Sequence, residues 1–165
     1  ITTMKKDATT NSFINPEPHV IVSCRDKDGR DNALSIGFIA NVSFNPRIIM
    51  IAILHTRYSH HIIKESGEFV VNIATEELKS EVEYLGSTSG RDTNKLENIS
   101  TTDATLINAP LIDMCPVNFE CRVVESLKPG THDVFFGEVL KVHCDEKYLN
   151  NNKSINWDKI NILHS

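Results

Sequence analysis

The 165-residue sequence has little that would suit a membrane or a nucleic acid. Its longest continuous apolar run is Ile48 to Leu54, whereas a membrane-spanning helix needs ~20 apolar residues. Lys and Arg never form a run, and the formal net charge is −5. We therefore expect neither a membrane nor a nucleic acid as a partner. A site for an anion would need a local concentration of positive charge.

An apolar leader is also missing, because the first dozen residues are polar, and we expect no signal peptide. Three residues precede the first methionine, Met4. Residues 1–11 are expected to be disordered or a remnant of expression, outside the fold. The four cysteines (Cys24, Cys115, Cys121 and Cys144) form no C-x-x-C pair. Together these features favour a cytoplasmic protein with reduced thiols.

Motifs of hydrolytic, metal and dinucleotide sites are missing as well. The chain has neither the G-x-S-x-G elbow of α/β-hydrolases nor the G-x-G-x-x-G fingerprint of a Rossmann domain. The adjacent pair His60-His61 would point about 100° apart on a helix. His143 and Cys144 would face opposite sides of a strand. The sequence therefore predicts no metal site.

What the sequence does contain is a series of short β-branched and apolar segments separated by turn residues. With 40% hydrophobic and 24% charged residues, its composition is that of an ordinary globular protein. The pattern favours five or six antiparallel strands, with a hairpin turn at Asp28-Gly29 and another at Lys128-Pro129-Gly130. The expected strands are residues 19–24, 33–39, 47–54, 69–74, 117–123 and 134–143.

Two short helices are expected between these strands. Tyr58, Ile62 and Ile63 repeat at helical spacing, and Gly67 ends that helix. A second helix covers residues 75–85, with Thr75 as its N-cap. Residues 91–110 are expected to form a long functional loop with short helical pieces. The result is one domain over residues 1–165, mainly β, built as a small barrel with short helices.

The segment Ser89-Gly90-Arg91-Asp92-Thr93-Asn94-Lys95 has the residues needed to hold a phosphate. Gly90 lets the backbone approach a ligand closely, hydroxyl groups supply donors, and Arg91 and Lys95 supply two cations four residues apart. A solvated surface loop with a turn glycine has the same composition. The segment by itself leaves both interpretations open.

Several segments in the same order resemble one family. They are the run 32–46 with Val42-Ser43-Phe44-Asn45-Pro46, the run 57–72 with Ser66-Gly67-Glu68-Phe69-Val70-Val71-Asn72, Ser89–Lys95, Ala109–Cys121, and His132 to Val139. Together, over most of residues 16–146, they are similar to the flavin reductase-like FMN-binding split-barrel family, and to its flavoredoxin-like branch most of all.

The resemblance implies non-covalently bound FMN, reduced by NADH or NADPH, in a homodimer. The electrons would pass to a flavin or to another acceptor, which could be a redox partner protein. His132 would be the catalytic residue near the flavin or the substrate. The implied cofactor-binding residues are Asn32, Ala33, Leu34, Ser35, Gly37, Phe38, Val42, Ser43, Arg57, Ser59, Ser89, Gly90, Arg91 and Lys95.

Other interpretations stay open at this point. Phe38 also fits an ordinary core position, Arg57 a solvated charge at a helix end, and His132 an exposed turn residue. An FMN-carrying electron-transfer protein, reduced by a partner protein and not by nicotinamide, would have the same motifs. A small-molecule-binding barrel without redox function is a third possibility.

Overall fold

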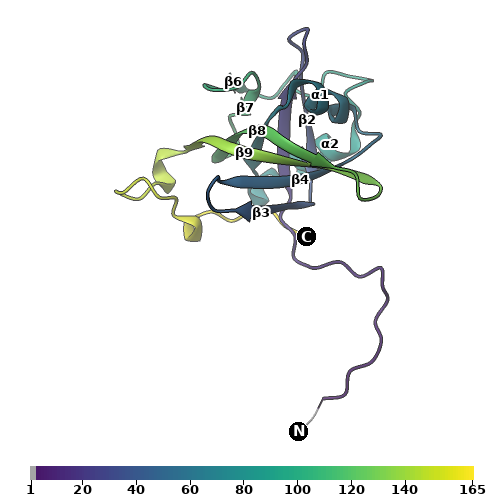
Figure 1. The fold of residues 1–165 in the computed structure, drawn as a ribbon. Coiled ribbons are helices and arrows are strands. Elements are labelled where there is room, and N and C mark those ends of the chain that lie inside the picture. The colour runs from purple at the N-terminus through teal and green to yellow at the C-terminus, as the bar shows by residue number, and fades with distance from the viewer. Residues whose placement is uncertain (1–2) are drawn as a thin grey trace.

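A seven-stranded antiparallel sheet forms the body of the protein in the computed structural model, which describes residues 3–165 (Figure 1). Its strand order is β2-β1-β5-β8-β9-β4-β3, and β6 and β7 form a separate two-stranded sheet. The strands are β1 (Val20–Arg25), β2 (Asp31–Ile36), β3 (Ile39–Ser43), β4 (Ile48–Leu54), β5 (Glu68–Ile73), β6 (Thr101–Asp103), β7 (Pro110–Ile112), β8 (Val117–Leu127) and β9 (His132–Cys144).

The sheet curls into a barrel because its two edge strands are neighbours in the sequence. β2 and β3 lie at opposite ends of the strand order, yet only Gly37 and Phe38 connect them. Three Cα–Cα steps span at most about 11 Å, so the two edges must approach each other. Among the described strands no ladder pairs β2 with β3, and the Ala52 amide, which donates to the carbonyl of Phe38 at 3.0 Å, only continues the β3–β4 register. The barrel is therefore split between β2 and the β3–β4 hairpin.

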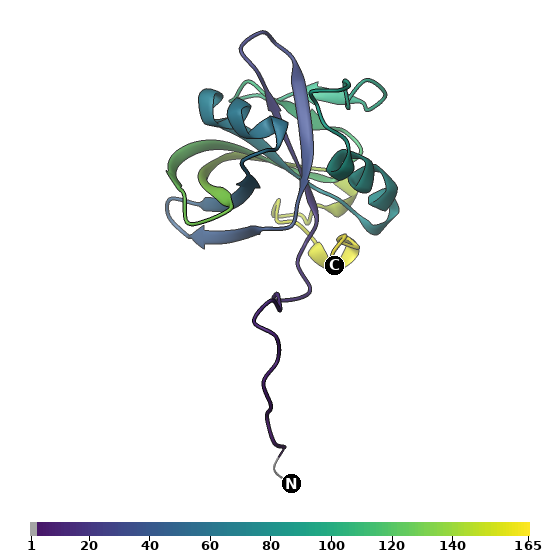
Figure 2. The same ribbon diagram turned by 90° about the vertical axis from the view of Figure 1, so that its right-hand side faces the viewer.

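Two helices cover this barrel on the side of β1 and β2 (Figure 2). Helix α1 (Tyr58–Ser66) buries Ile62 and Ile63 in the main core and ends at Gly67, whose φ is 68°. Helix α2 (Lys79–Ser87) buries Val82 and Leu85 in a second apolar cluster. Three further elements are single 3₁₀ turns: η1 (Glu76–Leu78), η2 (Glu146–Tyr148) and η3 (Trp157–Lys159). Among the described helices, none is long and apolar enough to cross a membrane.

Three expectations about local structure were wrong. The return strand expected over residues 33–39 is divided, because the chain leaves β2 at Ile36 and begins β3 on the opposite edge of the sheet. Thr75 precedes a 3₁₀ turn and makes no side-chain capping bond; the amide of Glu76 donates to the carbonyl of Asn161, and that of Leu78 to the backbone carbonyl of Thr75. The α-helix begins only at Lys79. Residues 91–110 contain β6 and turns in place of the expected helical pieces.

A buried carboxylate fixes the loop between β6 and β7 to the barrel. Glu120 in β8 is fully buried, and its two oxygens accept hydrogen bonds from the amides of Thr105 and Leu106, the Thr105 hydroxyl and the His143 ring. Burial raises the pKa of Glu120, but these donors outweigh it and lower the pKa to about 2. Glu120 thus joins three segments that are distant in sequence.

Replacing Glu120 with Gln should destabilise the fold, because the substitution removes the charge and places an amide donor against the Thr105 and Leu106 donors. We expect the free energy of unfolding at pH 7 to fall by about 2–3 kcal/mol. The folded pKa lies below the ordinary value of 4.5, so this stabilisation is lost as the pH falls from about 4.5 toward 2. Urea unfolding at pH 7 and pH 3 measures both effects, with the exposed Glu125→Gln as control. A variant equally weakened at both pH values would contradict this role for the charge.

Candidate functional site

Two hollows meet at the split of the barrel. The first, here called the cationic hollow, has a volume of about 260 Å³ and is lined by residues 56–59, residues 86–91, Asn32, Leu34 and Lys95. The second, here called the split hollow, has about 270 Å³ and is lined by residues 34–38, residues 52–54, Glu17, Arg57 and His132. Leu34 and Arg57 line both. The two therefore form neighbouring parts of one surface.

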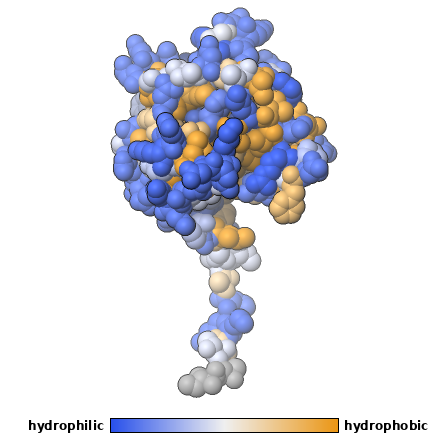
Figure 3. Space-filling view, turned by 90° about the vertical axis from the view of Figure 1, so that its left-hand side faces the viewer, coloured by the Kyte–Doolittle hydropathy of each residue, from blue (hydrophilic) through white to orange (hydrophobic). Residues whose placement is uncertain are grey.

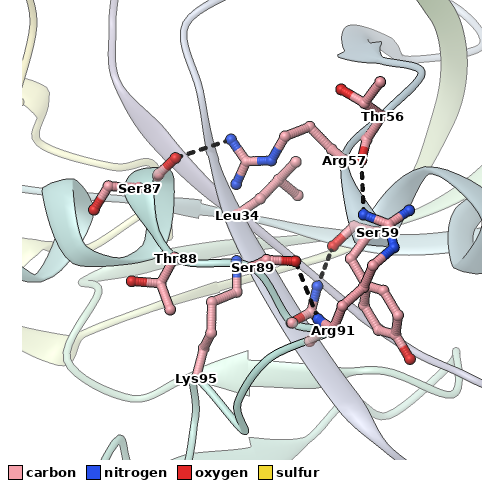
Figure 4. Close-up of a pocket in the computed structure, with 13 residues that line it drawn as sticks. Leu34, Thr56, Arg57, Ser59, Ser87, Thr88, Ser89, Arg91 and Lys95 are labelled. Carbon is pink, nitrogen blue, oxygen red and sulfur yellow. Dashed lines mark hydrogen bonds between the residues drawn. The ribbon is translucent and has the colours of Figure 1, made fainter.

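Three cations and no carboxylate line the cationic hollow. Figure 4 shows Arg57 on one side and Arg91 on the other, with Lys95 extending toward the same space. The Arg57 guanidinium donates to the carbonyls of Leu85 and Gly86 at 3.2 and 3.0 Å, and Lys95 Nζ donates to Leu85 at 3.0 Å. These carbonyls belong to the last turn of α2, where the helix dipole favours positive charge.

Lys95 is unusual because its side chain is buried, with only 3% of the residue exposed. Burial and the nearby charge of Arg57 together lower the pKa of Lys95 to about 8. Burial also lowers the pKa of Arg57. Among the described residues, neither Arg57 nor Lys95 forms an ion pair. The pair thus pays a desolvation cost that an anion in the hollow would offset.

The start of α1 forms the opposite wall of the cationic hollow. The N–H groups of Tyr58 and Ser59 lie in the first helical turn, which leaves them without intrahelical acceptors. Arg91 crosses to this wall, donating to the Thr56 carbonyl at 2.9 Å and lying 5.4 Å from the centre of the Tyr58 ring. Ser59 itself is fully buried, and its hydroxyl accepts a hydrogen bond from the Asn32 amide at 2.7 Å. Its hydroxyl is therefore already engaged within the chain.

The split hollow is more apolar and carries one histidine. Phe38 is 36% exposed, and its ring centre lies 5.1 Å from that of His132. The Nδ1 atom of His132 lies 2.8 Å from the Thr131 hydroxyl. The Ser35 hydroxyl donates to the carbonyl of Val82 in α2, so it holds β2 against that helix. A flat apolar group placed here would contact Phe38 and His132 together.

A cluster of one aspartate and two histidines lies next to this site and connects β9 to α1. Asp133, next to His132 in β9, accepts hydrogen bonds from His55 and His60, each at 2.7 Å. Burial raises the pKa of Asp133, but the bonds from His60 and His55 outweigh it and hold the pKa below its usual value. Because His55 follows β4 and His60 lies in α1, Asp133 fixes the start of α1 relative to β9.

Residues 13–158 match the family described as "Flavin reductase like domain". The chain belongs to this family. An uncharacterized protein of Archaeoglobus fulgidus is 37% identical over 84% of this chain and 78% of its own length. The NADH:riboflavin 5′-phosphate oxidoreductase of Streptomyces pristinaespiralis is 25% identical over 78% of this chain and 72% of its own. The crystal structure of flavoredoxin from Methanosarcina acetivorans superposes with a TM-score of 0.91 and 29% identity, covering 98% of this chain and 86% of that chain.

These comparisons confirm the family and the mainly β split-barrel fold expected from the sequence. The structure also brings together most of the residues that the resemblance to flavin reductases implied. Those in the two hollows are Asn32, Leu34, Ser35, Gly37, Phe38, Arg57, Ser59, Ser89, Gly90, Arg91, Lys95 and His132.

Three of the implied residues lie elsewhere. Ala33 is fully buried in the second apolar cluster. Val42 and Ser43 belong to β3 beyond both hollows, and Val42 is 47% exposed. Sequence reasoning also missed Thr56 and Glu17, which line the site. Thr56 could have been found, because it directly precedes the Arg-x-Ser motif, whereas Glu17 has no motif around it.

Gly90 has a different role from the one expected. A Cβ atom built on it would lie 2.5 Å from the Asn32 side-chain oxygen and 2.7 Å from a Tyr58 ring carbon. The backbone of the loop thus packs directly on β2 and α1, and Gly90 is required by this contact with the protein itself. The contact fixes the distance between Arg91 and the opposite wall.

Replacing Gly90 with Ala should push the loop away from Asn32 and Tyr58. We expect a loss of about 1–3 kcal/mol in the free energy of unfolding, as for other overpacked sites. Gly130→Ala is the matched control, because a Cβ there has nothing within 4 Å. Thermal and urea unfolding of the two variants measures the difference. Equal stability of Gly90→Ala and wild type would show that the loop can move without cost.

Proposed function

We propose that the chain binds FMN non-covalently across the two hollows and acts as an oxidoreductase. NADH or NADPH would supply the electrons, and a flavin or another acceptor would receive them. One observation carries this proposal: a hollow with three cations and no lining carboxylate adjoins an apolar one at the split of the barrel. FMN has the matching chemistry, because an anionic phosphate and an apolar ring system are joined in one molecule.

The residues present fit this group. Arg57, Arg91 and Lys95 would hold the phosphate, helped by the amides at the start of α1 and by the hydroxyls of residues 87–89. Leu34 and Phe38 would contact the ring system. Bound FMN would supply the hydride and electron transfer chemistry.

The chain itself would orient the cofactor and control the surroundings of the ring. The Asp133 cluster and the Asn32–Ser59 bond hold α1 at a fixed distance from β2 and β9. His132 has its Nδ1 beside the Thr131 hydroxyl, and its Nε2 could donate or accept a proton at the ring. Phe38 would limit the access of water to the split hollow.

A second function uses the same site without nicotinamide. The chain would then be an FMN-carrying electron-transfer protein, reduced by a partner protein. Its similarity to flavoredoxin from Methanosarcina acetivorans favours this alternative. Anaerobic addition of NADH or NADPH to the FMN-loaded protein separates the two. Rapid loss of the oxidised flavin absorbance supports the oxidoreductase, and no loss with either nucleotide supports the carrier. A chain that takes up no FMN would contradict both.

We further propose that the functional unit is a homodimer. The split hollow is open to solvent on one side in a single chain, and Phe38 and Leu54 are partly exposed there. Two-fold pairing would cover these groups and the cofactor together.

Removing a cation from the cationic hollow should weaken FMN and spare riboflavin, which has no phosphate. A charge-assisted hydrogen bond contributes roughly 1.5–3 kcal/mol, so Arg91→Ala or Lys95→Met should raise the Kd for FMN about 10- to 100-fold. Fluorescence titration with both flavins measures the effect, and Lys64→Ala, an exposed cation of α1, is the control. Equal losses for FMN and riboflavin would indicate damage to the loop instead.

The affinity for FMN should also fall above pH 8. Lys95 loses its proton near pH 8 in the free protein, whereas an adjacent phosphate favours the charged amine and raises its pKa. FMN binding is then coupled to proton uptake, and its Kd should rise by up to about tenfold per pH unit between pH 8 and pH 9.5. Riboflavin affinity and the Lys95→Met variant should lack this dependence. A flat FMN profile in the wild type would remove Lys95 from the phosphate site.

Replacing His132 with Gln should slow reduction or turnover more than it weakens FMN binding. Gln keeps a polar side chain beside Thr131 but has no ionisable group. We expect a changed pH profile of turnover between pH 6 and 8, with the Kd for FMN within about threefold of wild type. Stopped-flow reduction across this range measures it. An unchanged profile would make His132 a turn residue only.

A further inference from the structure

A large apolar hollow lies on another face of the barrel, away from the cationic residues. It has a volume of about 810 Å³, and its floor is formed by core residues of the open end of the barrel, among them Ile49, Val71 and Phe119. The C-terminal segment forms its rim with Leu149 and Trp157. We refer to it as the apolar hollow. Figure 3 shows apolar side chains gathered on this side of the body, framed by hydrophilic ones.

This surface is costly for a single chain in water. Val142, Leu149 and Trp157 are 43%, 38% and 41% exposed around the hollow. A contiguous exposed apolar patch of this kind marks an interaction site more often than a bare surface. The polar lining residues, such as Arg47 and Lys153, are exposed, and no buried polar side chain of the described lining points to a small ligand. The hollow therefore suits an apolar protein segment better than a small polar molecule.

The N-terminal arm provides such a segment. Residues 3–14 run away from the body, as Figures 1 and 2 show, and Phe13 and Ile14 are 68% and 93% exposed. The arm is fastened only at its base, where Asn15 and Glu17 form hydrogen bonds with Ser165. These two apolar side chains therefore lie directly before the anchored base and are largely exposed, although the Phe13 ring lies near Phe38 of its own chain.

We propose that the apolar hollow receives the N-terminal arm of a second copy of the chain, with Ile14 and Phe13 entering it. This inference rests on the proposed homodimer and assigns its surface. Pro18, where the arm leaves the body, itself lines the hollow. The point where the arm leaves the body therefore lies beside the hollow. In a two-fold dimer with both hollows near the axis, each arm could then reach the hollow of its partner. Ile14 lies four residues before Pro18 and can extend at most about 14 Å from it, so the two hollows of the dimer must lie next to the two-fold axis.

The exchanged arm would also explain how the dimer reaches the cofactor site. Phe13 already lies 5.8 Å from Phe38, ring centre to ring centre, and Glu17 lines the split hollow. Ile39 to Asn41, directly after Phe38, line the apolar hollow. When the arm of one chain is fixed in the partner's apolar hollow, its base passes the β2–β3 connection of its own chain. That connection lines the split hollow, so the arm would lie beside the proposed cofactor site.

A disulfide test uses a cysteine already present in the apolar hollow. Cys144 lines the hollow and is half-buried, whereas Cys24, Cys115 and Cys121 are buried. Ile14→Cys in the full-length, FMN-loaded protein should form an intermolecular disulfide with Cys144 under mild oxidation. Ile14→Cys combined with Cys144→Ser is the control and should give none. Non-reducing electrophoresis and peptide mass spectrometry identify the pair.

The outcomes divide clearly. A covalent dimer joined through residues 14 and 144 supports the exchange. A disulfide within one chain, or no disulfide between these positions, overturns it. Sedimentation provides a second measurement: Ile14→Ser should weaken self-association of the dimer at least tenfold, and unchanged association overturns the proposal.

These results are separable from the proposed function. FMN uptake and reduction by nicotinamide are measured on the wild type, without any cysteine variant. A wild type that binds FMN but sediments as a monomer overturns the exchange and leaves the cofactor site standing. A wild type that forms the 14–144 disulfide but binds no FMN contradicts the function alone.

Discussion

The connection of two residues between β2 and β3 determines most of this structure. Gly37 and Phe38 must carry the chain from one edge of a seven-stranded sheet to the other. Such a short link forces the sheet to curl until its edges approach each other, but among the described strands no ladder pairs β2 with β3. The edges therefore stay apart enough to leave the split hollow, and the connection itself becomes one of its walls.

The second constraint is electrostatic. The last turn of α2 faces the split. Its Leu85 and Gly86 carbonyls accept hydrogen bonds from Arg57, the residue before α1, and Leu85 also accepts from Lys95 in the loop after α2. Two cations held by the same carbonyl group repel each other, which contributes to the lowered pKa of Lys95. Carbonyl dipoles orient these groups without neutralising them. The arrangement leaves an excess of positive charge in a chain whose formal net charge is −5.

Sequence patterns were sufficient for the local elements and for the segments that form the site. Alternation in residues 117–123 and the apolar run before Leu54 predicted β8 and β4, because side-chain period follows directly from strand geometry. Gly67 was correctly placed as the end of α1. The motif residues Arg57 and Ser89–Lys95 do line one hollow. Their role toward a cofactor remains a prediction.

Patterns failed where a feature depends on pairing between distant segments. Nothing in the run 33–39 shows that its two halves lie on opposite edges of a sheet. The side-chain cap expected at Thr75 is absent, and the first amide after it donates to the carbonyl of Asn161, more than 80 positions later. Nothing around His60 in the sequence points to Asp133 of β9, the partner that it has in the structure. Such partners become visible only once strand order is known.

The charged groups removed from solvent in this protein are of two kinds: carboxylates that are paired within the chain, and cations that are not. Glu120 and Asp133 are buried carboxylates whose oxygens each accept at least one hydrogen bond, and histidines lie against both. These groups are satisfied within the chain and act as fasteners between segments. Arg57 and Lys95 also have hydrogen-bond partners, but among the described residues they have no counter-charge. A buried cation without an anion, such as Lys95, is unfavourable in the free protein, and the phosphate of the proposed cofactor would supply the missing charge.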